Sequence, residues 1–200
     1  MGLGDMQDIQ KVVRLCQDGQ LDAFATLFSH YQNRIYDLAC TILRDDVAAE
    51  DVVQDTFLAI FQKIDGFKGE SAFETWLTAI AVNQCRMRQR KLKVRQFLSL
   101  EQLSRRRLFR LSSREDTVPE IVHGHQCRQD LWSTVDQFDE RLRLPLILRY
   151  RYGHSCSDIA EILDRRVSTI YQQLNEGRRL LEQKLQQQEN GTSAVADAPG

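Results

Sequence analysis

The sequence has few of the residues that tight turns and disulfide frameworks need. Its 200 residues include ten glycines and three prolines, about half the usual share of these residues. That scarcity disfavours a β-sandwich or a β-barrel. The five cysteines are odd in number, far apart and without a C-x-x-C pair. This spacing argues against a disulfide framework or a zinc finger and favours a reducing compartment.

Long apolar segments are also missing. No apolar run approaches the length of a membrane span, and Asp5 and Asp8 stand where a signal peptide needs basic and then apolar residues. We therefore expect a cytoplasmic protein with no membrane insertion. Apolar residues make up 42% of the chain and charged residues 28%, which suffices for one domain or two small ones. A large multidomain enzyme is excluded.

The net charge is only −1, but the charges are distributed unevenly. Residues 1–85 carry 6 Lys and Arg against 13 Asp and Glu, and residues 86–110 carry 10 against 1. Residues 111–200 carry 11 against 14. An acidic block joined to a basic block predicts two partners, one positively charged and one a polyanion.

Apolar residues recur at steps of three and four in two parts of the chain, which predicts amphipathic helices. The first part contains one helix over Leu21–Leu43 and a second whose apolar residues run from Val53 to Ile64 and whose other face begins at Asp46. A third helix runs from Phe73 into a basic run at 86–91. The second part begins at Leu131. We expect an all-α protein with two small helical domains joined by a flexible linker. The expected boundaries are 1–20 for an N-terminal extension, 21–95 for the first domain, 96–125 for the linker, 126–186 for the second domain and 187–200 for a disordered tail.

Residues 155–185 have the pattern of a helix-turn-helix. Ser155 and Asp158 form a helix-start box, Asp164-Arg165-Arg166 makes the turn, and an apolar stripe marks the buried side of a second helix. The polar residues of that helix should face outward, where amides can pair with adenine in the major groove. An ordinary helical hairpin is the alternative. The side chains expected to meet duplex DNA are Arg165, Arg166, Ser168, Thr169, Tyr171, Gln172 and Gln173.

The stretch from Phe67 to Arg90 combines aromatic and basic residues. Phe67, Phe73 and Trp76 lie close to Lys68 in the sequence, and the basic run follows on the same helix. Proteins hold single-stranded nucleic acid with this combination, because bases stack on rings while cations follow the backbone. The alternative is that Phe73 and Trp76 are core residues and the basic run is a solvated face.

Three motifs resemble those of the bacterial sigma factors of the extracytoplasmic-function (ECF) class. They are Asp51–Phe61 (DVVQDTFLAIF), Phe67–Asn83 (FKGESAFETWLTAIAVN) and Leu142–Leu163 (LRLPLILRYRYGHSCSDIAEIL), and they occur in that family's order and spacing. The resemblance covers about Leu21–Arg95 as region 2 and Gln126–Leu185 as region 4.

The resemblance implies that region 2 binds core RNA polymerase and captures an unpaired promoter base, while region 4 reads the upstream promoter element as duplex. It implies a promoter-specificity subunit with no catalysis and no cofactor, and it allows an anti-sigma protein as a further partner. The polymerase contact would fall on Asp51, Gln54 and Asp55. The melting DNA would meet Lys68, Gly69, Ser71, Trp76, Asn83, Arg86, Arg88 and Arg90.

The second helix of the helix-turn-helix departs from the family pattern. Tyr171, Gln172 and Gln173 stand where basic residues are common, and Glu176-Gly177 replaces Arg-Ala or a similar pair. The turn Asp164-Arg165-Arg166 replaces a short apolar one. These changes keep the expected binding mode but leave the upstream DNA sequence undefined.

Two other functions remain as alternatives. A nucleic-acid enzyme would need a nucleophile or a carboxylate cluster, whereas the acidic residues of the second predicted helix are spread over one face. A stand-alone helix-turn-helix regulator would explain the C-terminal half but not Phe67–Asn83.

Two smaller groups of residues invite ligand or redox functions. His123, His125 and Cys127 form an H-x-H-x-C cluster that lacks a fourth ligand, so we expect no metal site. Cys40 and Cys85 fall beside apolar stripes and are expected to be small core residues rather than redox sensors.

Overall fold

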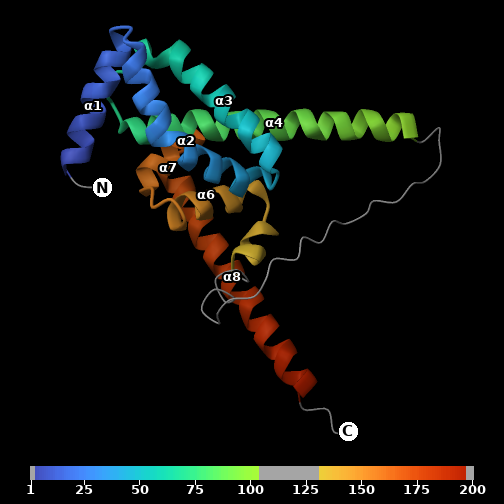
Figure 1. Ribbon diagram of the computed structural model, residues 1–200. Coiled ribbons are helices and arrows are strands. Elements are labelled where there is room, and N and C mark those ends of the chain that lie inside the picture. Colours follow the sequence, from blue (N-terminus) through green and yellow to red (C-terminus); the bar gives the residue numbers. More distant parts are fainter. Residues whose placement is uncertain (1–2, 104–130, 197–200) are drawn as a thin grey trace. The chain divides into compact units, whose positions relative to one another are not determined.

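The computed structural model describes residues 3–103 and 131–196. All regular structure in these two ranges is helical, which confirms the all-α expectation. The chain divides into two compact units, an N-terminal one built on α1 to α4 and a C-terminal one built on α6 to α8 (Figure 1).

The N-terminal unit is a helical bundle in which α2, α3 and α4 pack on one another and α1 packs on α2 (Figure 1). Its core contains side chains from each helix of the bundle, among them Leu27, Ile35, Ile60 and Leu77, all at most 2% exposed. These residues belong to the stripes spaced by three and four. The elements are α1 (Leu3–Gln17), α2 (Leu21–Leu43), α3 (Asp46–Lys63), the 3₁₀ turn η1 (Ile64–Gly66) and α4 (Phe73–Leu103).

The junction of α2 and α3 explains the break in the apolar pattern. Arg44 adopts the left-handed conformation, with φ of 57°, and its N–H donates to the Cys40 carbonyl at 2.8 Å. Asp45 then caps α3, because its side chain accepts a hydrogen bond from the Ala48 N–H at 2.9 Å. A helix end and a helix start therefore occupy two consecutive residues.

Helices extend into three segments outside the two predicted domains. Residues 1–20 were expected to be an extension, yet α1 covers Leu3–Gln17 and buries Val13 and Cys16. Helix α4 continues through Leu103, eight residues into the expected linker, since neither glycine nor proline interrupts residues 70–118. Helix α8 continues through Ala196, so the expected disordered tail is largely helical. The remainder of the linker, at 104–130, lies outside the described residues.

The C-terminal unit contains the predicted helix-turn-helix. Ser155 Oγ accepts from the Asp158 N–H at 3.1 Å and the Asp158 carboxylate accepts from the Ser155 N–H at 2.9 Å, which confirms the helix-start box. Asp164, with φ of 51°, ends α7, and α8 follows three residues later. The unit consists of a helical segment at 131–136, α6 (Glu140–Tyr150), α7 (Cys156–Leu163) and α8 (Val167–Ala196).

Helices α6 and α8 cross closely at Gly177. A Cβ atom at this position would lie 2.9 Å from Cδ1 of Leu146, which is itself 1% exposed. Glycine inside a helix costs about 1 kcal/mol relative to alanine. At this crossing the absence of a side chain is what allows the two helices to meet.

Candidate partner and nucleic-acid interfaces

One face of α3 combines acidic and apolar side chains. Asp51, Gln54 and Asp55 share this face, as their spacing predicted, and the last two are exposed. The face continues with Leu58 and Phe61, which are 60% and 54% exposed. Leu58 is not among the contacts predicted from the sequence, although its position four residues after Gln54 places it on the same face.

Aromatic rings from α2 and α3 support the apolar end of this face. The Phe24 ring lies 5.3 Å from the Phe61 ring and 6.2 Å from the Phe57 ring, both edge-on. Phe28 packs against Phe57 with ring centroids 4.6 Å apart and remains 37% exposed. The result is an exposed apolar surface directly beside exposed carboxylates.

Asp51 and Arg88 form an ion pair between α3 and α4. The family resemblance implies a polymerase contact for Asp51 and a DNA contact for Arg88, as independent charges. The packing of α3 on α4 brings them together across 37 residues of sequence. These two charges therefore neutralise each other, and Asp55 is the predicted carboxylate of this face that forms no ion pair within the described part of the chain.

The loop before α4 is anchored by aromatic contacts. The Phe67 ring lies 5.5 Å from the Phe73 ring and 5.2 Å from the Trp76 ring. Phe73 is buried, as the alternative of a core residue predicted. Trp76 is half-buried against the rings of Phe67 and Phe73 and is not fully exposed to solvent. Lys68 and Gly69 are exposed, and Gly69 takes a positive φ of 74° that favours glycine.

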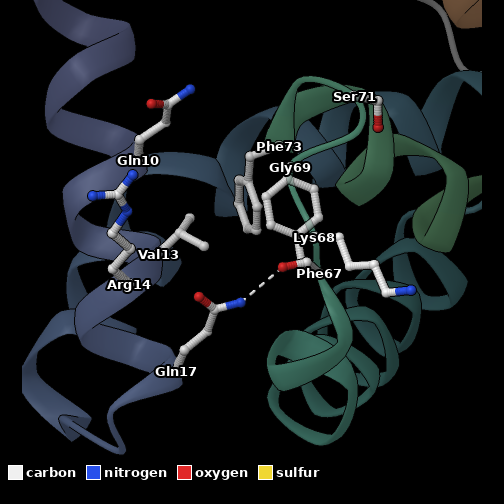
Figure 2. A pocket seen from close by; sticks show the side chains of 9 residues that line it. All are labelled: Gln10, Val13, Arg14, Gln17, Phe67, Lys68, Gly69, Ser71 and Phe73. Atoms are coloured by element: carbon white, nitrogen blue, oxygen red, sulfur yellow. Dashed lines mark hydrogen bonds between the residues drawn. The ribbon is translucent and has the colours of Figure 1, made fainter.

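Helix α1 holds this loop in place. The Gln17 side-chain amide donates to the carbonyls of Ile64 and Phe67, each at 2.9 Å. Figure 2 shows the bond to Phe67. A pocket of about 250 Å³ lies between α1 and the loop. This contribution of α1 was not predictable from the sequence, because Gln17 is separated from its two partners by 47 and 50 positions, and no local pattern links residues so far apart. The pocket is lined by Gln10, Val13, Arg14, Gln17, Phe67, Lys68, Gly69, Ser71 and Phe73 (Figure 2).

The remaining predicted contacts of α4 lie along one side of the helix. Asn83 and Arg90 are exposed and Arg86 is half-buried, at steps of three and four. Arg88 falls outside this spacing and turns to Asp51. The basic run is therefore divided between an internal ion pair and an exposed stripe.

In the helix-turn-helix, two predicted DNA contacts bind each other instead. Gln173 is 5% exposed, so the expectation that it faces outward is wrong. Arg165 donates to Gln173 Oε1 at 2.9 Å and to the Arg141 carbonyl at 3.5 Å. That carbonyl lacks its helical donor because Pro145, four residues later in α6, has no N–H. Arg165 thus ties the turn to α6 and α8, rather than projecting toward a phosphate.

The other predicted residues of this motif remain accessible. Arg166, Ser168, Tyr171 and Gln172 are exposed, and Thr169 is half-buried. The Tyr171 residue is 56% exposed. The outward face of α8 is therefore present with the composition expected, except for Gln173.

Comparison with known proteins identifies the family. The sigma-70 region 2 family matches residues 27–95, and the sigma-70 region 4 family matches residues 128–181. The chain is 31% identical to the ECF RNA polymerase sigma-E factor of Haemophilus influenzae, over 88% of this chain and 95% of the relative. The chain belongs to the ECF RNA polymerase sigma factors. As such a sigma factor it binds core RNA polymerase and directs promoter-specific transcription initiation.

Further relatives agree with this assignment. The sigma factor is 29% identical to the ECF RNA polymerase sigma factor SigW of Bacillus subtilis, over 88% of this chain and 96% of that protein. The solved structure of CnrH in complex with the cytosolic domain of CnrY shares its fold, with a TM-score of 0.61 at 21% identity, covering 88% of this chain and 95% of that one. The structure of the sigma factor RpoE in complex with the anti-sigma factor NepR from Bartonella quintana also shares the fold. Its TM-score is 0.60 at 21% sequence identity, covering 82% of this chain and 96% of that one.

The described part of the sigma factor offers neither a metal-binding cluster of side chains nor a helix that could span a membrane. Within residues 3–103 and 131–196 no group of His, Cys, Asp and Glu could hold a metal ion. His123, His125 and Cys127 lie outside the described residues. No helix in the described ranges has the length and apolarity needed to cross a membrane.

Proposed function

We propose that three separate surfaces of this sigma factor perform its three binding tasks. The exposed face of α3 binds core polymerase, the loop at 68–71 with Asn83 and Arg90 holds the opened promoter strand, and the first turns of α8 read the upstream duplex. The observation that carries this division is the exposure of Gln54, Asp55 and Leu58 on one face of α3. The stripe of Asn83, Arg86 and Arg90 lies on a different helix, α4.

The α3 face suits a partner that is basic and partly apolar. Asp55 supplies charge complementarity, which guides association and orients the partner. Leu58 and Phe61 supply the apolar anchors that protein interfaces bury at their centre. Asp51 can join this contact only by sharing its carboxylate with Arg88.

The pocket beside the loop suits an unpaired base. Exposed Lys68 stands at its rim and Phe67 forms one wall, so a base could enter while the cation meets the adjoining phosphate. Gln17 fixes the backbone of Phe67 and thereby the shape of the pocket. Ser71 also lines the pocket, and its hydroxyl can donate a hydrogen bond to the base or accept one from it.

The same proposal extends to the location and the regulation of this sigma factor. The family consists of initiation factors without catalysis of their own, and we propose that this chain likewise catalyses no reaction and acts in the cytoplasm. RpoE was solved with an anti-sigma factor, which supports an anti-sigma protein as a regulator here. A stand-alone regulator is disfavoured, because the region 2 match over residues 27–95 would then have no role.

The test is to separate polymerase binding from strand opening with two variants. Asp55→Lys should weaken binding to core polymerase about tenfold or more, because it replaces an attractive charge with a repulsive one. Asn83→Ala should leave core binding intact and reduce promoter melting. Core affinity is measured by pull-down and melting by permanganate reactivity.

Asp18→Lys serves as the charge control, since Asp18 is also exposed but follows α1. It should match the unmodified chain in both assays. Equal core binding by Asp55→Lys and Asp18→Lys would refute the α3 assignment. Normal melting by Asn83→Ala, with loss of duplex binding instead, would refute the strand assignment.

A further inference from the structure

The first three turns of α8 present an outward face without a single cation. Residues 167–177 contain no lysine or arginine. In a helix-turn-helix these N-terminal turns of the second helix reach the base edges in the major groove. The exposed side chains among them are Val167, Ser168, Tyr171, Gln172 and Asn175. The bases must therefore be read here by amide, hydroxyl, phenol and apolar groups.

Two arginines from outside this helix, Arg165 and Arg141, are engaged by side chains of α8. The Arg165 guanidinium donates to buried Gln173, as described above. The Arg141 guanidinium, from α6, donates to the Glu176 carboxylate at 2.9 Å. A guanine would have to compete with these contacts for either cation, with the buried Gln173 for Arg165 and with the surface carboxylate of Glu176 for Arg141.

Exposed cations flank this outward face at both ends. We call the face, formed by Val167, Ser168, Tyr171, Gln172 and Asn175, the reading face. Arg166 precedes α8, and Arg178 and Arg179 follow on its fourth turn. The Arg178 guanidinium also donates to Asn175 Oδ1, so one acceptor position of that amide is taken. Cations at the ends of a reading face are placed to contact phosphates, which position a protein on DNA without selecting its sequence.

The chemistry of the reading face discriminates between base pairs. Guanine is recognised chiefly by arginine or lysine on O6 and N7, whereas glutamine pairs in the same bidentate way with adenine N6 and N7. Apolar side chains contact the thymine methyl group. Gln172, flanked by Tyr171 and one turn from Ser168, is the exposed amide best placed for adenine.

We propose that α8 reads an upstream promoter element rich in A·T pairs, in which Gln172 pairs with an adenine and Val167 and Tyr171 contact thymine methyl groups. No guanine of this element is fixed by residues 167–177. The proposal rests on the duplex-reading role proposed above for α8 and names the bases that this surface selects.

The test is selection from a duplex library randomised over the promoter, using core polymerase with the full-length chain. A·T pairs should be enriched over the upstream element. Gln172→Ala should lower preference for one adenine about tenfold, and Gln172→Arg should shift that position to guanine. Gln183→Ala is the matched control, because Gln183 is an exposed amide of the same helix, about 16 Å further along it.

The possible results separate this inference from the proposal beneath it. An A·T-rich element that responds to Gln172→Ala and not to Gln183→Ala supports it. An upstream element with a required guanine that is indifferent to Gln172→Ala overturns it, while the duplex-reading role of α8 stands. No upstream enrichment at all, with initiation intact, overturns both.

Discussion

The hydroxyl of Thr56 is buried in the centre of the N-terminal unit. The residue is 0% exposed, and Thr56 Oγ1 has no hydrogen-bond partner within the described part of the chain. Thr78 offers a close comparison, since it is 3% exposed but donates its hydroxyl to the Glu74 carbonyl at 2.7 Å. A buried polar group without a partner costs about 1–3 kcal/mol.

Replacing Thr56 with valine should therefore stabilise the N-terminal unit. We expect Thr56→Val to raise its free energy of unfolding by about 1 kcal/mol, because valine keeps the shape and removes the unpaired hydroxyl. Thr78→Val, the control, should give no gain, since it removes a satisfied hydrogen bond. Urea unfolding followed by Trp76 fluorescence in a Trp132→Phe background measures both. An equal gain in the two variants would contradict the assignment.

At the scale of elements, the crossing of α6 and α8 decides how the reading helix is held. Gly177 lies against Leu146, and the Arg141–Glu176 ion pair and the Arg165–Gln173 hydrogen bond join the same parts of the domain. Leu146 is fully buried, so it has little room to move away from an added methyl group. Packing and helix propensity therefore oppose each other at position 177.

Packing should prevail at this crossing. We expect Gly177→Ala to lower the free energy of unfolding of the C-terminal unit by about 1 kcal/mol, because overpacking costs about 1–3 kcal/mol and the helix propensity returns about 1 kcal/mol. Combined with Leu146→Ala, the same change should be less harmful or stabilising, since the added methyl then enters the vacated space. Urea unfolding followed by Trp132 in a Trp76→Phe background is the measurement. A gain in stability from Gly177→Ala alone would show that propensity prevails.

At the scale of the whole molecule, the two units have separate cores and one of them holds a strongly shifted thiol. Cys85 is 0% exposed, and burial raises the pKa of its thiol from 9.0 to about 12. The folded unit therefore holds this proton more tightly than the unfolded chain does. The resulting stabilisation is complete below about pH 9 and is lost as the pH rises toward 12.

Alkaline pH should consequently weaken the N-terminal unit alone through this group. Between pH 8 and pH 10 we expect the stability advantage of the unmodified chain over Cys85→Ala to shrink by about 1 kcal/mol. The loss should appear in urea unfolding reported by Trp76, with no matching change reported by Trp132. A constant advantage at both pH values would mean that the thiol titrates normally in the folded state, and a parallel change at Trp132 would mean that the units unfold together.

The local features of this protein could be predicted from its pattern of residues alone. Apolar spacing marked α2, α3, α6 and the helix-turn-helix, because a helix needs only one buried stripe to be recognised. The Ser155–Asp158 box was predictable because its two hydrogen bonds join residues three positions apart. The exposed face of α3 followed from helical periodicity in the same way.

Which of these side chains remain available to partners depends on how the helices pack. Asp51 finds Arg88 across 37 residues, Gln17 reaches Phe67 across 50, and Arg165 reaches the carbonyl that Pro145 leaves without a donor across 24. Such pairings depend on which helices pack together, and no local pattern encodes them. Helical spacing also left Gln173 beside the boundary of the buried stripe, and the close crossing at Gly177 together with the Arg165 contact placed it inside.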